Sequence, residues 1–164
     1  MIIVERIRNL TNQHILIFVT RKEHFNAAHR LHNPEESDDW NRATYGKCNY
    51  PNYHGHNYVL KVTVAGEPDP RTGYIIDLGK LKAIIRDEIV DVCDHRNLNL
   101  DVDFLKGIIP TTENLVAAFY KQIRKKVENA CYGDAVLYNL KLYETERNIA
   151  EYSPYKILKN NEIS

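Results

Sequence analysis

The chain of 164 residues has few cysteines, no excess of one charge and no long apolar segment. Its three cysteines, Cys48, Cys93 and Cys131, are odd in number and form no Cys-x-x-Cys pair. This pattern excludes a disulfide framework and a Cys-rich zinc module. Twenty-two basic residues balance twenty-two acidic ones, so no overall positive field attracts a nucleic acid or an anionic membrane. We expect neither as a partner.

The longest strongly apolar run, residues 15–19, is far shorter than the ~20 residues that a membrane-spanning helix needs. The first residues also lack the basic-then-apolar order of a signal peptide, so we expect a cytoplasmic protein. The length suits one domain. We assign residues 15–158 to that domain, residues 1–14 to an N-terminal extension and residues 159–164 to a polar tail.

Hydrophobic periodicity predicts four strands and two helices. The strands are expected at residues 15–31, 54–64, 135–145 and 148–152, and the helices at 78–92, after an Asp77 cap, and from Thr111 to about 127. Residues 32–53 are rich in turn-forming residues and predict a long functional loop. This order favours an α+β fold in which a four-stranded antiparallel sheet carries both helices on one face. Because four strands cannot close a barrel alone, the open edges predict assembly into a homo-oligomer.

Three histidines indicate a metal site. His54 and His56 are two residues apart in a strand, so their side chains share a face with Cα atoms ~6.5 to 7 Å apart. His29 has the same parity as Phe25 and Ala27 on the preceding strand, which makes it a natural third ligand if the two strands pair. Three histidines without a fourth protein ligand are typical of a catalytic zinc ion, because one position stays open for water or substrate.

Two other interpretations of these residues stay open. The histidines can be ordinary core or surface residues. Alternatively, Cys48, six positions before His54, can serve as a fourth ligand of a purely structural zinc ion.

Five motifs in order along the chain carry a family resemblance: Phe25-x-Ala-x-His29-Arg-Leu31, Tyr45-Gly-Lys-Cys48-Asn-x-Pro-Asn-x-His54-Gly-His56-Asn-Tyr58, Asp94-His95-x-Asn-Leu98, Thr111-Thr-Glu-Asn114 and Tyr143-Glu144-Thr. Together they resemble the 6-pyruvoyl-tetrahydropterin synthase family. The resemblance implies a tunnelling fold, in which three subunits close a barrel and two trimers stack into a hexamer. It also implies zinc bound by His29, His54 and His56, and 7,8-dihydroneopterin triphosphate as the small-molecule substrate.

The resemblance assigns roles to further residues. Cys48 matches the catalytic cysteine, Asp94 and His95 match the pair that supports it, and Glu144 matches the carboxylate that anchors the pterin ring. Adjacent residues such as Asp94 and His95 do not readily pair through their side chains, so their relay geometry is left open. Thr112 and Glu113 are expected to cap the second helix and to lie near the substrate.

Two alternative functions stay open besides the one that the resemblance implies. The first is 6-carboxy-tetrahydropterin synthase of queuosine biosynthesis, which uses the same substrate and metal; five residues between Cys48 and His54 favour the pyruvoyl-forming enzyme instead. The second is a non-catalytic, zinc-stabilised pterin-binding module. The sequence leaves four candidates for binding the triphosphate: Arg30, Lys47, Lys61 and Arg71.

Overall fold

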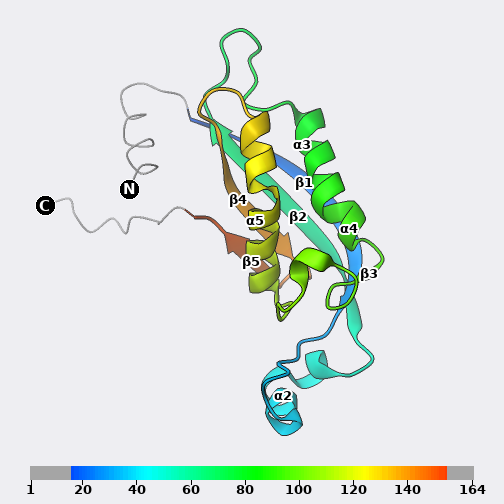
Figure 1. Cartoon of the computed structure of the whole chain (residues 1–164). Helices are drawn as coiled ribbons and strands as arrows, with labels where there is room; N and C mark the ends of the chain where they lie inside the picture. The colour runs from blue at the N-terminus through cyan, green and yellow to red at the C-terminus, as the bar shows by residue number, and fades with distance from the viewer. Residues whose placement is uncertain (1–15, 155–164) are drawn as a thin grey trace, which may run out of the picture.

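A computed structural model describes residues 16–154 (Figure 1); the expected extension at 1–14 and the tail at 159–164 lie outside this range. The strands are β1 (Ile17–His29), β2 (His54–Gly66), β3 (Arg96–Asn97), β4 (Val136–Tyr143) and β5 (Ile149–Tyr152). The α-helices are α2 (Asp38–Tyr45), α3 (Leu78–Ile85), α4 (Asp91–Cys93) and α5 (Thr112–Ala130). Shorter helical turns are η1 (Gly46–Asn49), η2 (Arg86–Val90) and η3 (Asp103–Leu105).

The sheet is mixed and has five strands in the order β3-β1-β2-β4-β5. The four expected strands pair antiparallel as predicted. The expected number of four strands is corrected to five, because β3 adds a short parallel pairing with β1 at Ala27 and Ala28. β1 and β2 form the longest pair and remain in register from Ile17↔Gly66 to His29↔His54.

A side chain caps the start of each long helical segment, and at the first of them it is the predicted Asp77. The Asp77 carboxylate accepts a hydrogen bond from the Gly79 N–H (2.7 Å), and the Thr111 hydroxyl accepts one from the Asn114 N–H (3.2 Å). These side chains satisfy amide groups that the first helical turn leaves without partners. The expected capping by Thr112 and Glu113 is corrected: Thr111 is the cap, and the two residues lie in the first turn.

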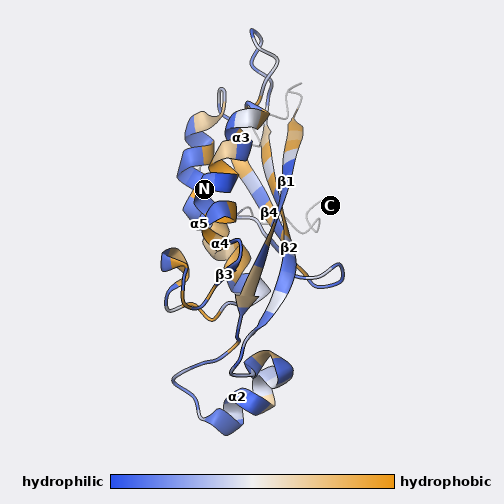
Figure 2. Ribbon diagram, turned by 90° about the vertical axis from the view of Figure 1, so that its right-hand side faces the viewer, coloured by the Kyte–Doolittle hydropathy of each residue, from blue (hydrophilic) through white to orange (hydrophobic). Residues whose placement is uncertain are grey.

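The helices cover one face of the sheet, as expected, and no described helix covers the other (Figure 2). Helix α5 contacts β4 and β5. Alternate residues of β2 and the apolar stripe of α5 both belong to the buried layer; examples are Leu60, Val62, Leu115, Phe119 and Ile123, all fully buried. Burial of such side chains contributes about 1.5–3 kcal/mol each. The core therefore lies between the sheet and the helices.

Residues 32–53 were expected to form a loop and instead contain α2 and η1, which project as a separate lobe at one end of the molecule (Figure 1). The Ser37 hydroxyl caps α2 by accepting from the Trp40 N–H at 3.2 Å. The buried Asn41 side chain then donates to the carbonyl groups of Asn33, Glu36 and Ser37. These bonds order a segment whose composition is typical of turns.

In the part of the chain that the structure describes, no helix combines the length and apolar character needed to cross a membrane.

Candidate functional site

The three predicted metal ligands meet where β1 ends and β2 begins. His29 lies directly opposite His54 in the antiparallel register, and His56 lies opposite Ala27. One nitrogen atom of each imidazole lies within 4.8 Å of the corresponding atoms of the other two. Because strand alternation places these side chains on the helix-facing side of the sheet, the cluster sits beneath the start of α5.

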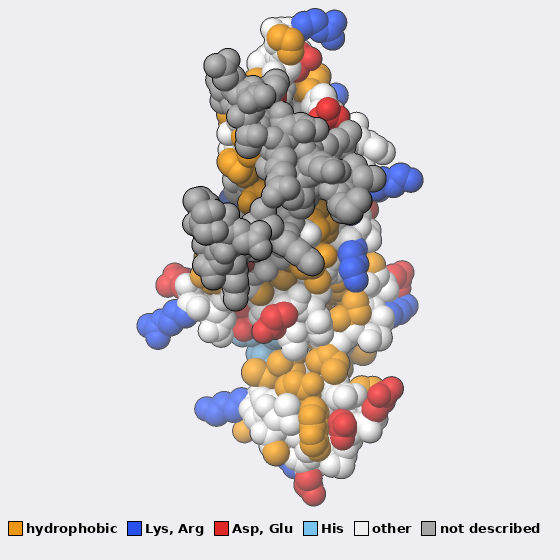
Figure 3. All heavy atoms as spheres, turned by 90° about the vertical axis from the view of Figure 1, so that its left-hand side faces the viewer, with side chains coloured by type: hydrophobic (Ala, Val, Ile, Leu, Met, Phe, Trp, Pro, Cys, Tyr) orange, Lys and Arg blue, Asp and Glu red, His pale blue; other side chains and the backbone are white. Residues whose placement is uncertain are grey.

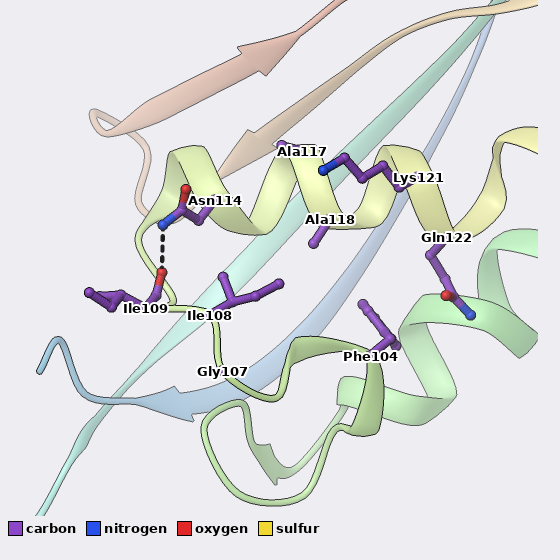
Figure 4. A pocket seen from close by; sticks show the side chains of 9 residues that line it. All are labelled: Phe104, Gly107, Ile108, Ile109, Asn114, Ala117, Ala118, Lys121 and Gln122. Atoms are coloured by element: carbon purple, nitrogen blue, oxygen red, sulfur yellow. Dashed lines mark hydrogen bonds between the residues drawn. The ribbon is translucent and has the colours of Figure 1, made fainter. Parts of the chain in front are cut away.

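Two backbone features fix the geometry of the cluster. A Cβ atom at Gly55 would lie 3.2 Å from the Ala27 carbonyl oxygen, so glycine lets the strands approach closely between the two histidines. The Pro110 carbonyl accepts a hydrogen bond from His29 Nδ1 at 2.9 Å. The segment before α5 that carries Pro110 is itself held in place, because Asn114 Nδ2 donates to the carbonyl of the preceding residue, Ile109, at 2.9 Å (Figure 4).

The cluster has the properties of a metal-binding site. His29 Nε2, His54 Nδ1 and His56 Nε2 are buried and have no hydrogen-bond partner among the described residues. Burial lowers the pKa of His29 to about 4, although the bond to Pro110 opposes the shift, and burial and His56 lower the pKa of His54. Both imidazoles are thus neutral near pH 7 and free to donate a lone pair, as zinc requires.

Glu144 lies beside the histidines. Its Oε1 atom is 3.6 Å from His29 Nε2 and 3.9 Å from His56 Nε2. The tight connection between β4 and β5 holds the residue, because its N–H donates to the Asn148 carbonyl at 3.1 Å. A carboxylate in this position can accept two hydrogen bonds from a flat heterocycle that lies next to the metal site.

Tyr58 borders the cluster on β2, with its ring 5.6 Å from that of His56 and 6.0 Å from that of His29. The side chain is fully buried, and its hydroxyl has no hydrogen-bond partner among residues 16–154. Burial, and secondarily Glu144, raise the pKa of Tyr58 far above its usual value. The hydroxyl is therefore protonated at any physiological pH.

We expect Tyr58→Phe to leave the free energy of unfolding unchanged or to raise it, because the lost hydroxyl makes no bond to protein. Tyr120→Phe is the matched control: the Tyr120 hydroxyl donates to the Leu137 carbonyl at 2.9 Å, so its removal costs about 1 kcal/mol. Urea unfolding of both variants measures the difference. A loss of 1 kcal/mol or more in Tyr58→Phe would contradict this account.

Cys48 lies in η1, and its carbonyl accepts a hydrogen bond from the Leu31 N–H at 2.9 Å, which ties it to the end of β1. The thiol is half-buried and free. Among the described residues, the group of side chains able to share one ion contains His29, His54 and His56, without Cys48. This arrangement disfavours the alternative in which the cysteine is a fourth ligand.

Asp94 and His95 pair directly, which corrects the expectation that neighbouring residues do so poorly. His95 Nδ1 is 2.9 Å from Asp94 Oδ2, and Asp94 Oδ1 accepts from the Asn26 N–H at 2.7 Å. His95 has a φ of 58°, a left-handed conformation that is rare outside glycine and often marks functional sites. The Asn26 N–H and the His95 side chain hold the pKa of Asp94 below its usual value.

The Asp94–His95 pair lies at the surface of the chain. The His95 side chain is 78% exposed, and within residues 16–154 no hydrogen bond joins it to Cys48. Histidine atoms reach the surface at the junction between the body and the α2 lobe (Figure 3). Thr112 and Glu113 lie in the first turn of α5, directly after the segment that carries Pro110.

The sequence did not predict the contribution of Pro110 and Asn114 to the histidine cluster. The Pro110 acceptor is a backbone carbonyl, which any residue type could supply.

Comparison with known proteins connects this geometry to one family. A family model described as 6-pyruvoyl tetrahydropterin synthase matches residues 18–155. The human 6-pyruvoyl tetrahydrobiopterin synthase is 41% identical over 134 residues, which cover 82% of this chain and 89% of that protein. The solved structure of the Caenorhabditis elegans 6-pyruvoyl tetrahydropterin synthase has 40% identity and a TM-score of 0.76, over 87% of this chain and 98% of that one.

A relative with a different reaction also matches. The dihydroneopterin monophosphate aldolase of Pyrococcus furiosus is 41% identical over 91 residues, which cover 56% of this chain and 69% of that protein. The match to the synthases is longer, and the family resemblance seen in the five motifs is confirmed. The chain belongs to the 6-pyruvoyl tetrahydropterin synthase family.

Proposed function

We propose that this chain converts 7,8-dihydroneopterin triphosphate into 6-pyruvoyl-tetrahydropterin and releases triphosphate, with a zinc ion held by His29, His54 and His56. The observation that carries the proposal is the cluster of three imidazoles whose unpartnered nitrogen atoms lie beside the Glu144 carboxylate. The Glu144 carboxylate suits the pterin ring of the substrate, and an ion held by the three imidazoles suits the hydroxyl groups of the substrate side chain.

Zinc would supply Lewis-acid stabilisation of the negative charge that develops when a C–H proton leaves the substrate side chain. Glu144 accepts hydrogen bonds from the 2-amino group and a ring N–H of the pterin. Such paired recognition is selective, because a heterocycle without these donors leaves the carboxylate unsatisfied. Thr112 and Glu113, at the start of α5, are proposed as further substrate contacts.

Cys48, as a thiolate, takes the proton. The imidazole of His95, oriented by Asp94, favours that charged form. Because the pair is exposed and, within residues 16–154, forms no hydrogen bond with Cys48, we propose that the two parts meet across a subunit interface. The edge of β1 supports assembly: β3 pairs only with Ala27 and Ala28, which leaves residues 17–25 without a partner strand on that side in the described chain. Two stacked trimers that close a barrel form the proposed hexamer, which works in the cytoplasm.

Mass analysis of the products formed from 7,8-dihydroneopterin triphosphate by the zinc-loaded protein tests the proposal. The expected products are 6-pyruvoyl-tetrahydropterin and triphosphate. A shortened carboxylate side chain would instead assign the queuosine-pathway reaction, and cleavage of the side chain by a retro-aldol reaction would assign the activity named for the Pyrococcus relative. Absence of turnover would favour the alternative function, a non-catalytic, zinc-stabilised pterin-binding module.

A further inference from the structure

A buried amide side chain holds the turn that carries Cys48 against the chain that follows β1. This residue, Asn49, comes directly after the cysteine and is only 5% exposed. Its Nδ2 atom donates to the Leu31 carbonyl at 2.7 Å and to His32 Nδ1 at 3.1 Å. Both hydrogen atoms of the amide group are therefore used, and both bonds tie the cysteine turn to the end of β1.

Arg30 adds to the same contact. Its Nε atom donates to the backbone carbonyl of Asn49 at 2.8 Å, and its Nη2 atom lies 3.5 Å from Asn49 Oδ1. The bond from the Leu31 N–H to the Cys48 carbonyl completes the set. These bonds join two segments of the chain at the point where it passes from the sheet into the α2 lobe (Figure 1).

The segment that receives Asn49 is itself fixed to the body of the protein. The Arg30 N–H donates to Asn99 Oδ1, and Asn99 Nδ2 donates back to the Arg30 carbonyl, both at 2.9 Å. The residue before Arg30 is His29, whose imidazole is bonded to the Pro110 carbonyl. The end of β1 is thus a fixed platform that carries one histidine of the cluster and, through Asn49, the cysteine turn.

The position of the Cys48 thiol depends on this turn. Within residues 16–154, the thiol makes no side-chain hydrogen bond that would orient it. Burial, then Glu144 and then Cys48 raise the pKa of Tyr58, so the thiol lies near the ring that borders the histidine cluster. A reacting group that is misplaced by about 1 Å can lose about 10²-fold in rate, and the bonds that fix the turn therefore bear on catalysis.

We propose that Asn49 is a positioning residue: its amide fixes the Cys48 turn on the end of β1 and so holds the thiol beside the histidine cluster. This inference rests on the proposed function, in which Cys48 accepts the proton. Asn49 itself touches neither the substrate nor the metal, and it acts through the cysteine turn.

Kinetics of Asn49→Ala and Asn49→Asp, with the zinc-loaded full chain as reference, provide the first test. The aspartate variant keeps the shape of the side chain and loses both donated bonds. We expect kcat to fall about 10²-fold in both variants, the usual cost of a misplaced reacting group. KM and zinc content should stay near the wild-type values, because Glu144 and the three imidazoles are unchanged.

Asn41→Ala is the matched control. This second buried asparagine donates to the carbonyl groups of Asn33, Glu36 and Ser37, all before the cysteine turn. Its loss weakens the lobe but leaves the bonds of Asn49 in place, so kcat should stay near the wild-type value. An equal loss of kcat in Asn41→Ala would mean that any weakening of the lobe is sufficient, and it would overturn the proposal.

A double-variant cycle separates positioning from a general loss of structure. In a Cys48→Ala background, Asn49→Ala should lower kcat no further, because no thiol remains to be positioned. Effects of the two substitutions that multiply would show that Asn49 acts independently of the cysteine. Unchanged kcat in both Asn49 variants would also end the proposal.

Alkylation of Cys48 by iodoacetamide gives a measurement that does not depend on turnover. Asn49→Ala should raise its rate about tenfold, the factor by which loss of one buried hydrogen bond increases the population of an opened turn. Asn41→Ala should react like the wild type, and peptide masses distinguish Cys48 from Cys93 and Cys131. Equal rates in the wild type and both Asn49 variants would contradict the positioning role, whichever product the protein forms, so this role and the proposed function fail separately.

Discussion

Cys48→Ala is expected to lower kcat about 10³-fold, the usual contribution of a positioned acid or base, while bound zinc stays at one ion per chain. The thiol is the proposed proton acceptor, and the three imidazoles form the ion-binding group without it. Measurement of turnover together with metal content on the same sample separates the two effects. Cys131→Ala is the matched control, because that thiol donates to the Val127 carbonyl at the end of α5 and should not affect turnover.

Two outcomes would contradict this role. Full turnover with zinc bound would remove Cys48 from the reaction, and loss of the metal would restore the interpretation in which the cysteine is a structural ligand. Mixing two inactive variants extends the test. If Cys48 and His95 meet across an interface, subunits of Cys48→Ala and His95→Ala that reassemble together should regain part of the activity, since some mixed sites carry both native residues.

The sequence predicted the elements whose own pattern determines them. β2 alternates strictly between buried and half-buried residues from Tyr58 to Val64, and α3 begins at a capping carboxylate, so period and cap were sufficient. β3 could not be predicted in this way, because it has only two residues and depends on distant partners. The His95 N–H donates to the Asn26 carbonyl at 2.6 Å, and the Leu98 N–H donates to the Ala28 carbonyl at 2.8 Å.

In the candidate site, too, the features with a local sequence pattern were predicted, and those that depend on distant parts of the chain were not. His54 and His56 form a local signal, and His29 followed from strand parity once the two strands were paired. The hydrogen bond from His29 to Pro110 spans 81 positions of the chain, and its acceptor is a backbone atom that any residue could supply.

Removal of the metal is expected to abolish turnover and to leave the fold intact. The hydrophobic core between sheet and helices is closed by apolar side chains such as Phe25, Leu60 and Phe119, and the histidine cluster lies at one end of it. Chelation therefore removes a ligand and not the core, so the melting temperature should fall only by the amount that loss of binding predicts. Activity, circular dichroism and thermal unfolding before and after chelation, with zinc added back at the end, measure each part.

Single variants locate the metal. His56→Ala should lose the ion, because one of the three grouped nitrogen atoms is gone. His24→Ala, on the exposed side of β1, should keep a full complement of metal. Unfolding upon chelation would favour the zinc-stabilised binding module, since a structural zinc ion supplies folding free energy directly. Turnover that survives complete removal of the metal would show that the three histidines act without one.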